Sequence, residues 1–387
     1  MVPASVFRHS RPGRELSARA VRCYTSVYLI IGRKPEKSVD AAARRVEDGR
    51  NDERAGEAFR PGPFRPAWWL PGPHAQTIAG KYLRPRTGVR YRRERVDTPD
   101  GDFLDLDWAS VAGRSDLPDD APLAVVVHGL EGSSGSAYVL EACRMLHDRG
   151  IRSVAMNFRS CSGEPNRTAR MYHAGETGDL SLVLDLASRR WPAAALGAVG
   201  FSLGANVLLK YLGERGERAK LRAAAAVSIP FDLNAGALKL DASLMGRIYV
   251  GIFVRSLKRK FLAKRELVGE RCDERAVLAA RSFREFDDAA TARLHGFRDV
   301  DDYYSTQSSR HFIAGIRRPT LLVHAVDDPF VDEHAIPRDA VRANPHLTPA
   351  FTPHGGHVGF IAGPPWAPGF WAEREAARFL ASRLGTG

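Results

Sequence analysis

The chain has 387 residues, of which 44% are hydrophobic, 9% aromatic and 26% charged. This composition is typical of a soluble globular protein with a large core, and a chain that is disordered overall is not expected. The most apolar N-terminal stretch, residues 24–32, is too short to span a membrane, and a cytoplasmic protein is expected.

The net charge of the chain is +12 at pH 7. The basic excess is spread along the sequence and no nucleic-acid-binding motif accompanies it, so nucleic acid is not an expected partner. The four cysteines have neither the paired spacing of a zinc site nor the density of a disulfide framework. Reduced thiols and no zinc site at these cysteines are therefore expected.

The N-terminal part, residues 1–58, is rich in charged side chains and shows little hydrophobic periodicity. It predicts a basic, flexible extension, and the folded domain is expected over residues 59–387. Near the start of this domain, two strands are expected at 91–96 and 102–108. The sequence Thr98-Pro99-Asp100-Gly101 between them has the chemistry of a turn, which predicts a β-hairpin.

Short apolar runs then alternate with segments of helical periodicity. The expected strands are 123–128, 151–158, 196–201 and 222–229, and the expected helices are 136–149, 179–190 and 203–212. Strands that alternate with helices of this length form a parallel sheet with helices on both faces. The predicted fold class is therefore α/β.

A helix-rich, charged stretch at about residues 231–318 interrupts this alternation. Strand 320–326, helix 332–343, strand 348–352 and helix 371–383 then complete the domain. An insertion at this point lies over the carboxyl ends of the strands, where α/β sheets bind their ligands, and we interpret it as a cap.

One cap segment is strongly apolar at helical spacing, with arginines and lysines elsewhere on its surface. Its apolar residues are Met245, Ile248, Tyr249, Ile252, Phe253, Leu257 and Phe261. Packing of this apolar face on the core is favoured, and contact with anionic lipid is the alternative.

Residues 196–211, LGAVGFSLGANVLLKY, run from an apolar strand into a helix through Gly200-Phe201-Ser202-Leu203-Gly204. A nucleophile on such a strand-to-helix turn needs small residues on either side, because side chains there would clash with the neighbouring backbone. The pattern alone is common by chance. It becomes informative only if a base and an orienting acid follow in the right order.

Both groups follow, each after a later strand. Asp328 ends one strand and His357 lies in the loop after the next, so the order is Ser…Asp…His. Asp327 and His354 are the rivals. Asp328 is favoured because it lies just past the strand, and His357 because it follows two glycines that permit a close turn. The expected catalytic residues are Ser202, Asp328 and His357.

An oxyanion formed during attack on a carbonyl requires backbone donors. The N–H of Leu203, after the nucleophile, and the N–H of Leu130, in the glycine-rich loop after the 123–128 strand, are the expected donors. That loop has neither the P-loop nor the dinucleotide-binding pattern, so it is not interpreted as a phosphate-binding loop. His128, His173 and His324 are interpreted as structural.

Several motifs in this order resemble the YheT-like branch of the α/β-hydrolases, the AB hydrolase 4 family. They are His74-Ala75-Gln76-Thr77, His128 to Gly132, Asn157 to Arg167, Tyr172 to Thr177, Gly200 to Asn206, Phe286-Asp287-Asp288, Asp327 to Phe330 and His354 to Phe360. The resemblance covers residue 59 to the C-terminus. One departure is Ser160, which stands where the family pattern has glycine.

The resemblance implies an α/β-hydrolase fold with Ser202, Asp328 and His357 at the triad positions. It also implies hydrolysis of carboxylic esters of small molecules or lipids, without metal or cofactor. Acyl transfer on the same triad and a non-catalytic binding protein are the alternatives. Peripheral membrane contact, acyl-chain length and oligomeric state stay open.

Overall fold

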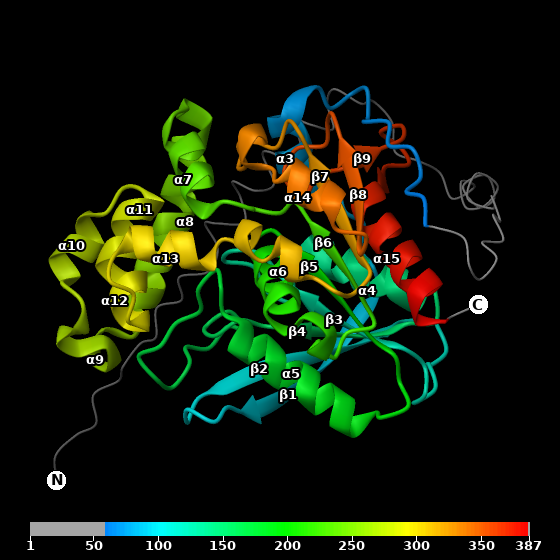
Figure 1. Ribbon diagram of the computed structural model, residues 1–387, viewed down its shortest axis with the longest axis horizontal. Coiled ribbons are helices and arrows are strands. Elements are labelled where there is room, and N and C mark those ends of the chain that lie inside the picture. Colours follow the sequence, from blue (N-terminus) through cyan, green and yellow to red (C-terminus); the bar gives the residue numbers. More distant parts are fainter. Residues whose placement is uncertain (1–58, 386–387) are drawn as a thin grey trace, which may run out of the picture. The chain divides into compact units, whose positions relative to one another are not determined.

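The computed structural model describes residues 59–385 and contains an eight-stranded sheet with the order β1-β2-β4-β3-β5-β6-β7-β8 (Figure 1). The strands are β1 Val89–Asp97, β2 Phe103–Val111, β3 Leu123–Val127, β4 Arg152–Met156, β5 Leu196–Phe201, β6 Ala223–Val227, β7 Thr320–Ala325 and β8 Leu347–Thr352. The predicted N-terminal extension, residues 1–58, lies outside the described residues.

In the sheet, the neighbouring strands β4, β3, β5, β6, β7 and β8 are parallel. The strand β2 is antiparallel to both of its neighbours, β1 and β4. The hairpin turns at Thr98–Gly101, where the Gly101 N–H donates to the carbonyl of Thr98. The strands β3, β5, β6 and β7 are buried along their whole length, as expected for strands covered on both faces. These features confirm the predicted α/β fold.

Helices cover both faces of the sheet. On one face lie α4 Ala137–His147 and α15 Trp371–Leu384, and on the other lie α5 Thr177–Arg190, α6 Leu203–Arg215 and α14 Arg338–Ala343. The side chains of β3 alternate between these layers: Val125 and Val127 belong to the core with α5 and α6, and Ala124 and Val126 to the core with α4 and α15. This period of two follows from the pleat of a strand.

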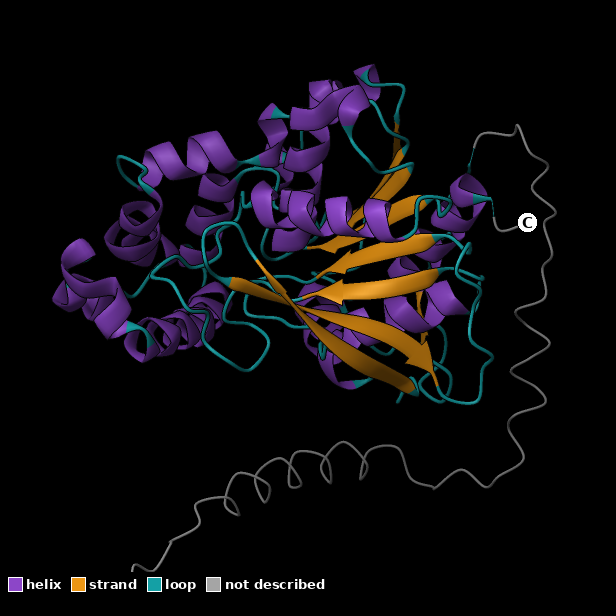
Figure 2. Ribbon diagram, turned by 90° about the horizontal axis from the view of Figure 1, so that it is seen from below, coloured by secondary structure: helices purple, strands orange, loops and turns teal. Residues whose placement is uncertain are grey.

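The insertion between β6 and β7 is helical, as predicted. It contains α7 Leu233–Asp241, α8 Leu244–Ala263, α9 Arg265–Val268, α10 Glu274–Ala279, α11 Phe283–Phe286, a π-helical turn Asp287–Thr291, α12 Ala292–His295 and α13 Val300–Gln307. We call residues 233–307 the cap. The arrowheads of the parallel strands point toward the side on which the cap helices lie (Figure 2).

Two local expectations were wrong in part. The expected helix 332–343 is divided into a short 3-10 turn, Glu333–Ala335, and α14, because Pro337 separates them and cannot supply a backbone N–H. In α8, Leu257 and Phe261 are buried as expected, but Ile248 and Ile252 are exposed.

The remaining elements are α3 Gly72–Tyr82 and a small hairpin of β9 Ile361–Ala362 and β10 Gly369–Phe370. Among residues 59–385, no helix has both the length and the apolar character needed to cross a bilayer. The cysteines in this range, Cys143, Cys161 and Cys272, are buried free thiols.

Candidate active site

Ser202 lies on the turn between β5 and α6. Its φ is +52° and its ψ −119°, a conformation that L-residues rarely adopt. A Cβ on Gly200 would lie 2.6 Å from the Gly204 carbonyl oxygen, and a Cβ on Gly204 would lie 2.5 Å from the His128 carbonyl oxygen. The two glycines are therefore required by space, and the turn holds the serine in a strained, fixed position.

Two hydrogen bonds join the three side chains expected from the sequence. Ser202 Oγ lies 2.8 Å from His357 Nε2, and His357 Nδ1 lies 2.8 Å from Asp328 Oδ2. A carboxylate can only accept, so Nδ1–H donates to Asp328 and leaves Nε2 free to accept the serine proton. The arrangement has the geometry of an activated nucleophile with an oriented base.

The two rival residues form a separate pair. His354 Nδ1 lies 3.2 Å from Asp327 Oδ2, and the other oxygen of Asp327 accepts the Gly356 N–H at 3.0 Å. His354 is 67% exposed in its side chain, whereas that of His357 is 11% exposed. Asp327 thus stabilises the loop that carries His357 through His354 and the Gly356 N–H, and it forms no hydrogen bond to the His357 ring within residues 59–385.

Asp328 is fully buried, and its surroundings favour its ionised form. Burial tends to raise its pKa, but the adjacent His357 and the Phe330 N–H bonded to Oδ1 outweigh burial and hold the pKa below its usual value. The carboxylate is therefore ionised at neutral pH. Lys239 Nζ donates to the carbonyls of Asp328 and Val331, which fixes the loop around this charge.

The loop after β3 approaches Ser202 closely. A Cβ on Gly129 would lie 3.0 Å from Ser202 Cβ, so the residue before Leu130 lies beside the serine. Within residues 59–385, neither the Leu130 N–H nor the Leu203 N–H donates a hydrogen bond. An oxyanion requires backbone donors that are not already bonded.

Comparisons with known proteins agree with this geometry. A sequence profile of the alpha/beta hydrolase fold matches residues 122–364. YheT of Escherichia coli (strain K12) is 38% identical over 315 residues, which are 80% of this chain and 91% of that protein. The chain belongs to the α/β-hydrolase fold family. The resemblance to the YheT-like branch is confirmed.

Other relatives of this α/β-hydrolase carry names of lipid-ester hydrolases. Phospholipase ABHD3 of Mus musculus is 32% identical over 302 residues, 78% of this chain and 74% of that one. The monoacylglycerol lipase of Saccharomyces cerevisiae is 32% identical over 251 residues, 63% of this chain and 56% of that one. A solved structure of the Pyrococcus furiosus esterase Pf2001 has a TM-score of 0.50 at 17% identity, over 85% of this chain and 99% of that one, which supports the fold alone.

Sequence reasoning missed several residues that hold the His357 ring and its loop in place. The Phe330 ring stacks on the His357 ring at a centroid distance of 4.3 Å. Thr77 Oγ1 accepts the His357 N–H at 2.9 Å, and the fully buried Ser228 accepts the next N–H, that of Val358. Thr77 belongs to the His74–Thr77 motif, which was the available signal. Phe330 belongs to the Asp327–Phe330 motif, but that motif gives no indication that its ring stacks on His357.

Glu131 connects the loop after β3 with the cap. Its carboxylate accepts hydrogen bonds from Tyr172, from Ser256 and from Lys260, the last two of which lie on α8. The Tyr172 hydroxyl also accepts the Glu131 N–H at 2.9 Å. Glu131 has φ +54°, so these bonds fix a strained residue directly after Leu130.

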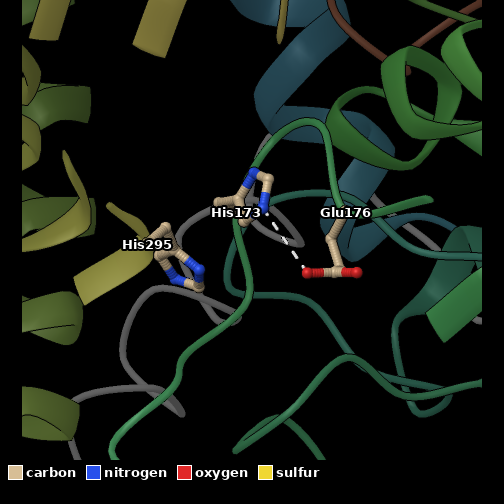
Figure 3. Close-up of side chains that lie close together, drawn as sticks. All are labelled: His173, Glu176 and His295. Carbon is tan, nitrogen blue, oxygen red and sulfur yellow. Dashed lines mark ion pairs between the residues drawn. The ribbon is translucent and has the colours of Figure 1, made fainter. Parts of the chain in front are cut away.

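One group of described side chains has donor atoms spaced like metal ligands. His173, Glu176 and His295 place one such atom each within 4.8 Å of one another (Figure 3). Glu176 already forms an ion pair with Arg170, and the Gly175 N–H donates to His173 Nδ1, which leaves the proton on Nε2 facing Glu176. A cation would have to displace a guanidinium and shift a proton, so the donor set fits an ion poorly.

His128 and His324 are buried, as expected for structural histidines. Burial lowers the pKa of each to about 4, so both rings are neutral at neutral pH. Ser160, the departure from the family pattern, has φ +61° and exchanges hydrogen bonds with Asn166. Its position therefore favours glycine, and the bonds to Asn166 stabilise the serine in its place.

Proposed function

We propose that this α/β-hydrolase cleaves carboxylic esters with Ser202 as nucleophile, His357 as general base and Asp328 as the group that orients it. The observation that carries the proposal is the continuous chain of two 2.8 Å contacts from Ser202 Oγ through His357 to the buried Asp328 carboxylate. A serine hydroxyl is a weak nucleophile at neutral pH and requires this kind of base.

The reaction begins when His357 Nε2 takes the proton of Ser202 as Oγ attacks the ester carbonyl carbon. Negative charge develops on the carbonyl oxygen, and the Leu130 and Leu203 N–H groups stabilise it. The protonated His357 then donates to the leaving alcohol, and an acyl-enzyme forms. Water, activated by the same histidine, attacks the acyl carbonyl and releases the acid.

The proposed substrates are acyl esters of lipid-like or small alcohols. Two relatives with this fold are named as a phospholipase and a monoacylglycerol lipase, and both names describe esters of fatty acids. The aromatic side chains next to the base agree with an apolar acyl group, because Phe330 and, beyond it, Tyr249 and Phe253 lie on the cap side of His357.

Labelling with a fluorophosphonate tests the proposal, since the probe reacts with activated serines. The wild type is expected to be labelled, and Ser202→Ala to be unlabelled. Ser382→Ala on α15 is the matched control, because among residues 59–385 the Ser382 hydroxyl bonds only to the Phe379 carbonyl within its own helix. A folded wild type that takes no label, or a labelled Ser202→Ala, would contradict the proposal.

Turnover of p-nitrophenyl esters from short to long acyl chains tests the substrate class. Loss of Ser202 or His357 should lower kcat by about 10⁴ to 10⁶. An acyl chain preference beyond a few carbons would support lipid-like substrates. Hydrolysis of acetyl esters alone would restrict the activity to small esters.

A further inference from the structure

The cap helix α8 has three faces with different surroundings. Val250, Val254, Leu257 and Phe261 are buried in the interior of the cap. These residues recur every three to four positions, as expected for the buried stripe of a helix. They explain why the helix forms, and they leave two other faces to be accounted for.

The second face of α8 looks toward the candidate active site. The Tyr249 and Phe253 rings lie 4.9 and 6.2 Å from the Phe330 ring, which itself stacks on His357. The Tyr249 hydroxyl lies 3.1 Å from Nδ1 of His74, in the first turn of α3. One aromatic side chain thus separates α8 from the base.

The third face of α8 is apolar and exposed. Leu244, Ile248 and Ile252 are 71%, 47% and 62% exposed. They are spaced four residues apart, so they form one stripe. Single exposed apolar side chains are ordinary, but a contiguous exposed stripe on an already packed helix indicates a surface that binds something.

Basic side chains continue the same stripe toward the C-terminal end of α8. Arg255 and Arg259 are exposed and form no salt bridge with any residue from 59 to 385. At 3.6 residues per turn, they fall with the three apolar side chains within an arc of about 80°. The helix has no acidic residue, so the face combines apolar and purely positive character.

We propose that the outer face of α8, defined by Leu244, Ile248, Ile252, Arg255 and Arg259, docks this protein on an anionic lipid surface. The apolar side chains enter the boundary between headgroups and acyl chains, and the arginines pair with lipid phosphates and carboxylates. The purpose of this docking rests on the proposed function, because docking through α8 brings the lipid next to the helix that borders His357. A protein partner would match the apolar stripe equally, but the unpaired arginines favour an anionic surface.

Vesicle flotation of the full chain carrying Ser202→Ala tests docking without turnover. Binding is expected to vesicles of phosphatidylcholine with phosphatidylserine, and to be weak with phosphatidylcholine alone. It should fall between about 0.1 M and about 1 M salt, where the Debye length shrinks from about 10 Å to about 3 Å. If the Ser202→Ala chain does not bind, or if its binding is insensitive to both lipid charge and salt, the proposal is overturned.

Two variants locate the surface. Leu244→Ser/Ile248→Ser/Ile252→Ser should lower the vesicle partition coefficient by about 100-fold, because three partly exposed aliphatic side chains no longer enter the lipid. Arg255→Gln/Arg259→Gln should lower it by about 10- to 30-fold on anionic vesicles only. Leu267→Ser/Leu278→Ser is the matched control, since both leucines are exposed elsewhere in the cap, and it should bind like the wild type.

The outcomes separate this surface from the proposed function. The triple serine variant with an intact Ser202 should hydrolyse a water-soluble short-chain ester at the wild-type rate, because these side chains do not contact the triad. Binding without hydrolysis by the wild type would refute the proposed function and leave the surface standing. The lipid surface would be overturned if the triple serine variant bound vesicles as tightly as the unsubstituted chain. It would also be overturned if the protein bound no vesicles and formed a dimer that the triple substitution dissociates.

Discussion

Replacing Asp328 by asparagine removes one charge from the interior while nearly preserving its shape. In the structure Asp328 Oδ2 accepts from His357 Nδ1 at 2.8 Å, and Oδ1 accepts the Phe330 N–H at 2.8 Å. An asparagine can keep only one of these bonds with its carbonyl. If its NH₂ group faces Nδ1, the imidazole must accept there, and its proton moves to Nε2, where the serine proton should go.

The expected loss has two parts. An imidazolium and a carboxylate whose charge centres lie roughly 4 Å apart interact by about 4 kcal/mol at an effective dielectric constant of 20, and the variant loses this in the transition state. The wrong tautomer adds to it. The sum, about 5.5 kcal/mol, corresponds to about 10⁴ in kcat, which is also the loss known for this substitution in the serine-protease triad.

The assay is kcat on a p-nitrophenyl ester, with circular dichroism to establish that the variant is folded. Asp327→Asn is the matched control: the neighbouring residue has the same chemistry, but its side chain bonds to His354 and the Gly356 N–H. It should lower kcat by less than about tenfold. The reasoning is refuted if Asp328→Asn keeps more than a tenth of the wild-type kcat, or if Asp327→Asn loses as much.

Three further predictions concern the surroundings of the site. Gly204→Ala should destabilise the fold by about 3 kcal/mol or more in urea unfolding, because its Cβ would lie 2.5 Å from the His128 carbonyl oxygen. The control is Gly251→Ala at an exposed position of α8, where a Cβ would have nothing within 4 Å and should stabilise the fold by up to about 1 kcal/mol. Equal effects of the two substitutions would contradict this. Glu131→Gln should lower kcat by about tenfold at nearly constant KM, because the uncharged amide binds Lys260 more weakly and loosens the loop at Leu130; a change confined to KM would exclude this positioning role. Burial raises the pKa of Asp287 from 3.8 to about 6, so the folded state holds this proton more tightly and its contribution is fully present below about pH 4 and is lost as pH rises through about 6. The free energy of unfolding of the wild type relative to Asp287→Asn should therefore fall by about 2 kcal/mol between pH 4 and 7, and a pH-independent difference would show that the carboxyl is not buried as described.

Much of the fold could be predicted from local patterns. Each buried strand is a short apolar run between turn residues, and each covering helix repeats its apolar residues every three to four positions. Such patterns depend on neighbours in sequence, so β3 to β8 and the insertion after β6 were predicted from the chain alone. Breaks within an element were less predictable, as at Pro337, where one missing N–H divides an expected helix.

The chemistry of the candidate site was also visible in the sequence, because it requires particular residue types in a particular order. Each of the three residues follows a predicted strand: Ser202 lies between two glycines after one strand, and the aspartate and the histidine follow later strands. Each of these positions can be recognised from its neighbours in the sequence. The choice between Asp328 and Asp327 was less certain. Adjacent residues at a strand end point in opposite directions, and only the packed structure shows Asp328 beside His357 and Asp327 beside His354.

The tertiary structure alone decided what the faces of α8 touch and what Glu131 binds. A helical stripe in a sequence says that a face is apolar, but not whether protein covers it, since burial depends on segments distant in the chain. Residues 244–263 are apolar around most of the helix, and the structure assigns one face to the cap interior, one to the surroundings of His357 and one to solvent. The sequence by itself determined which chemistry is present, and the packing of distant segments decided which side chains act together.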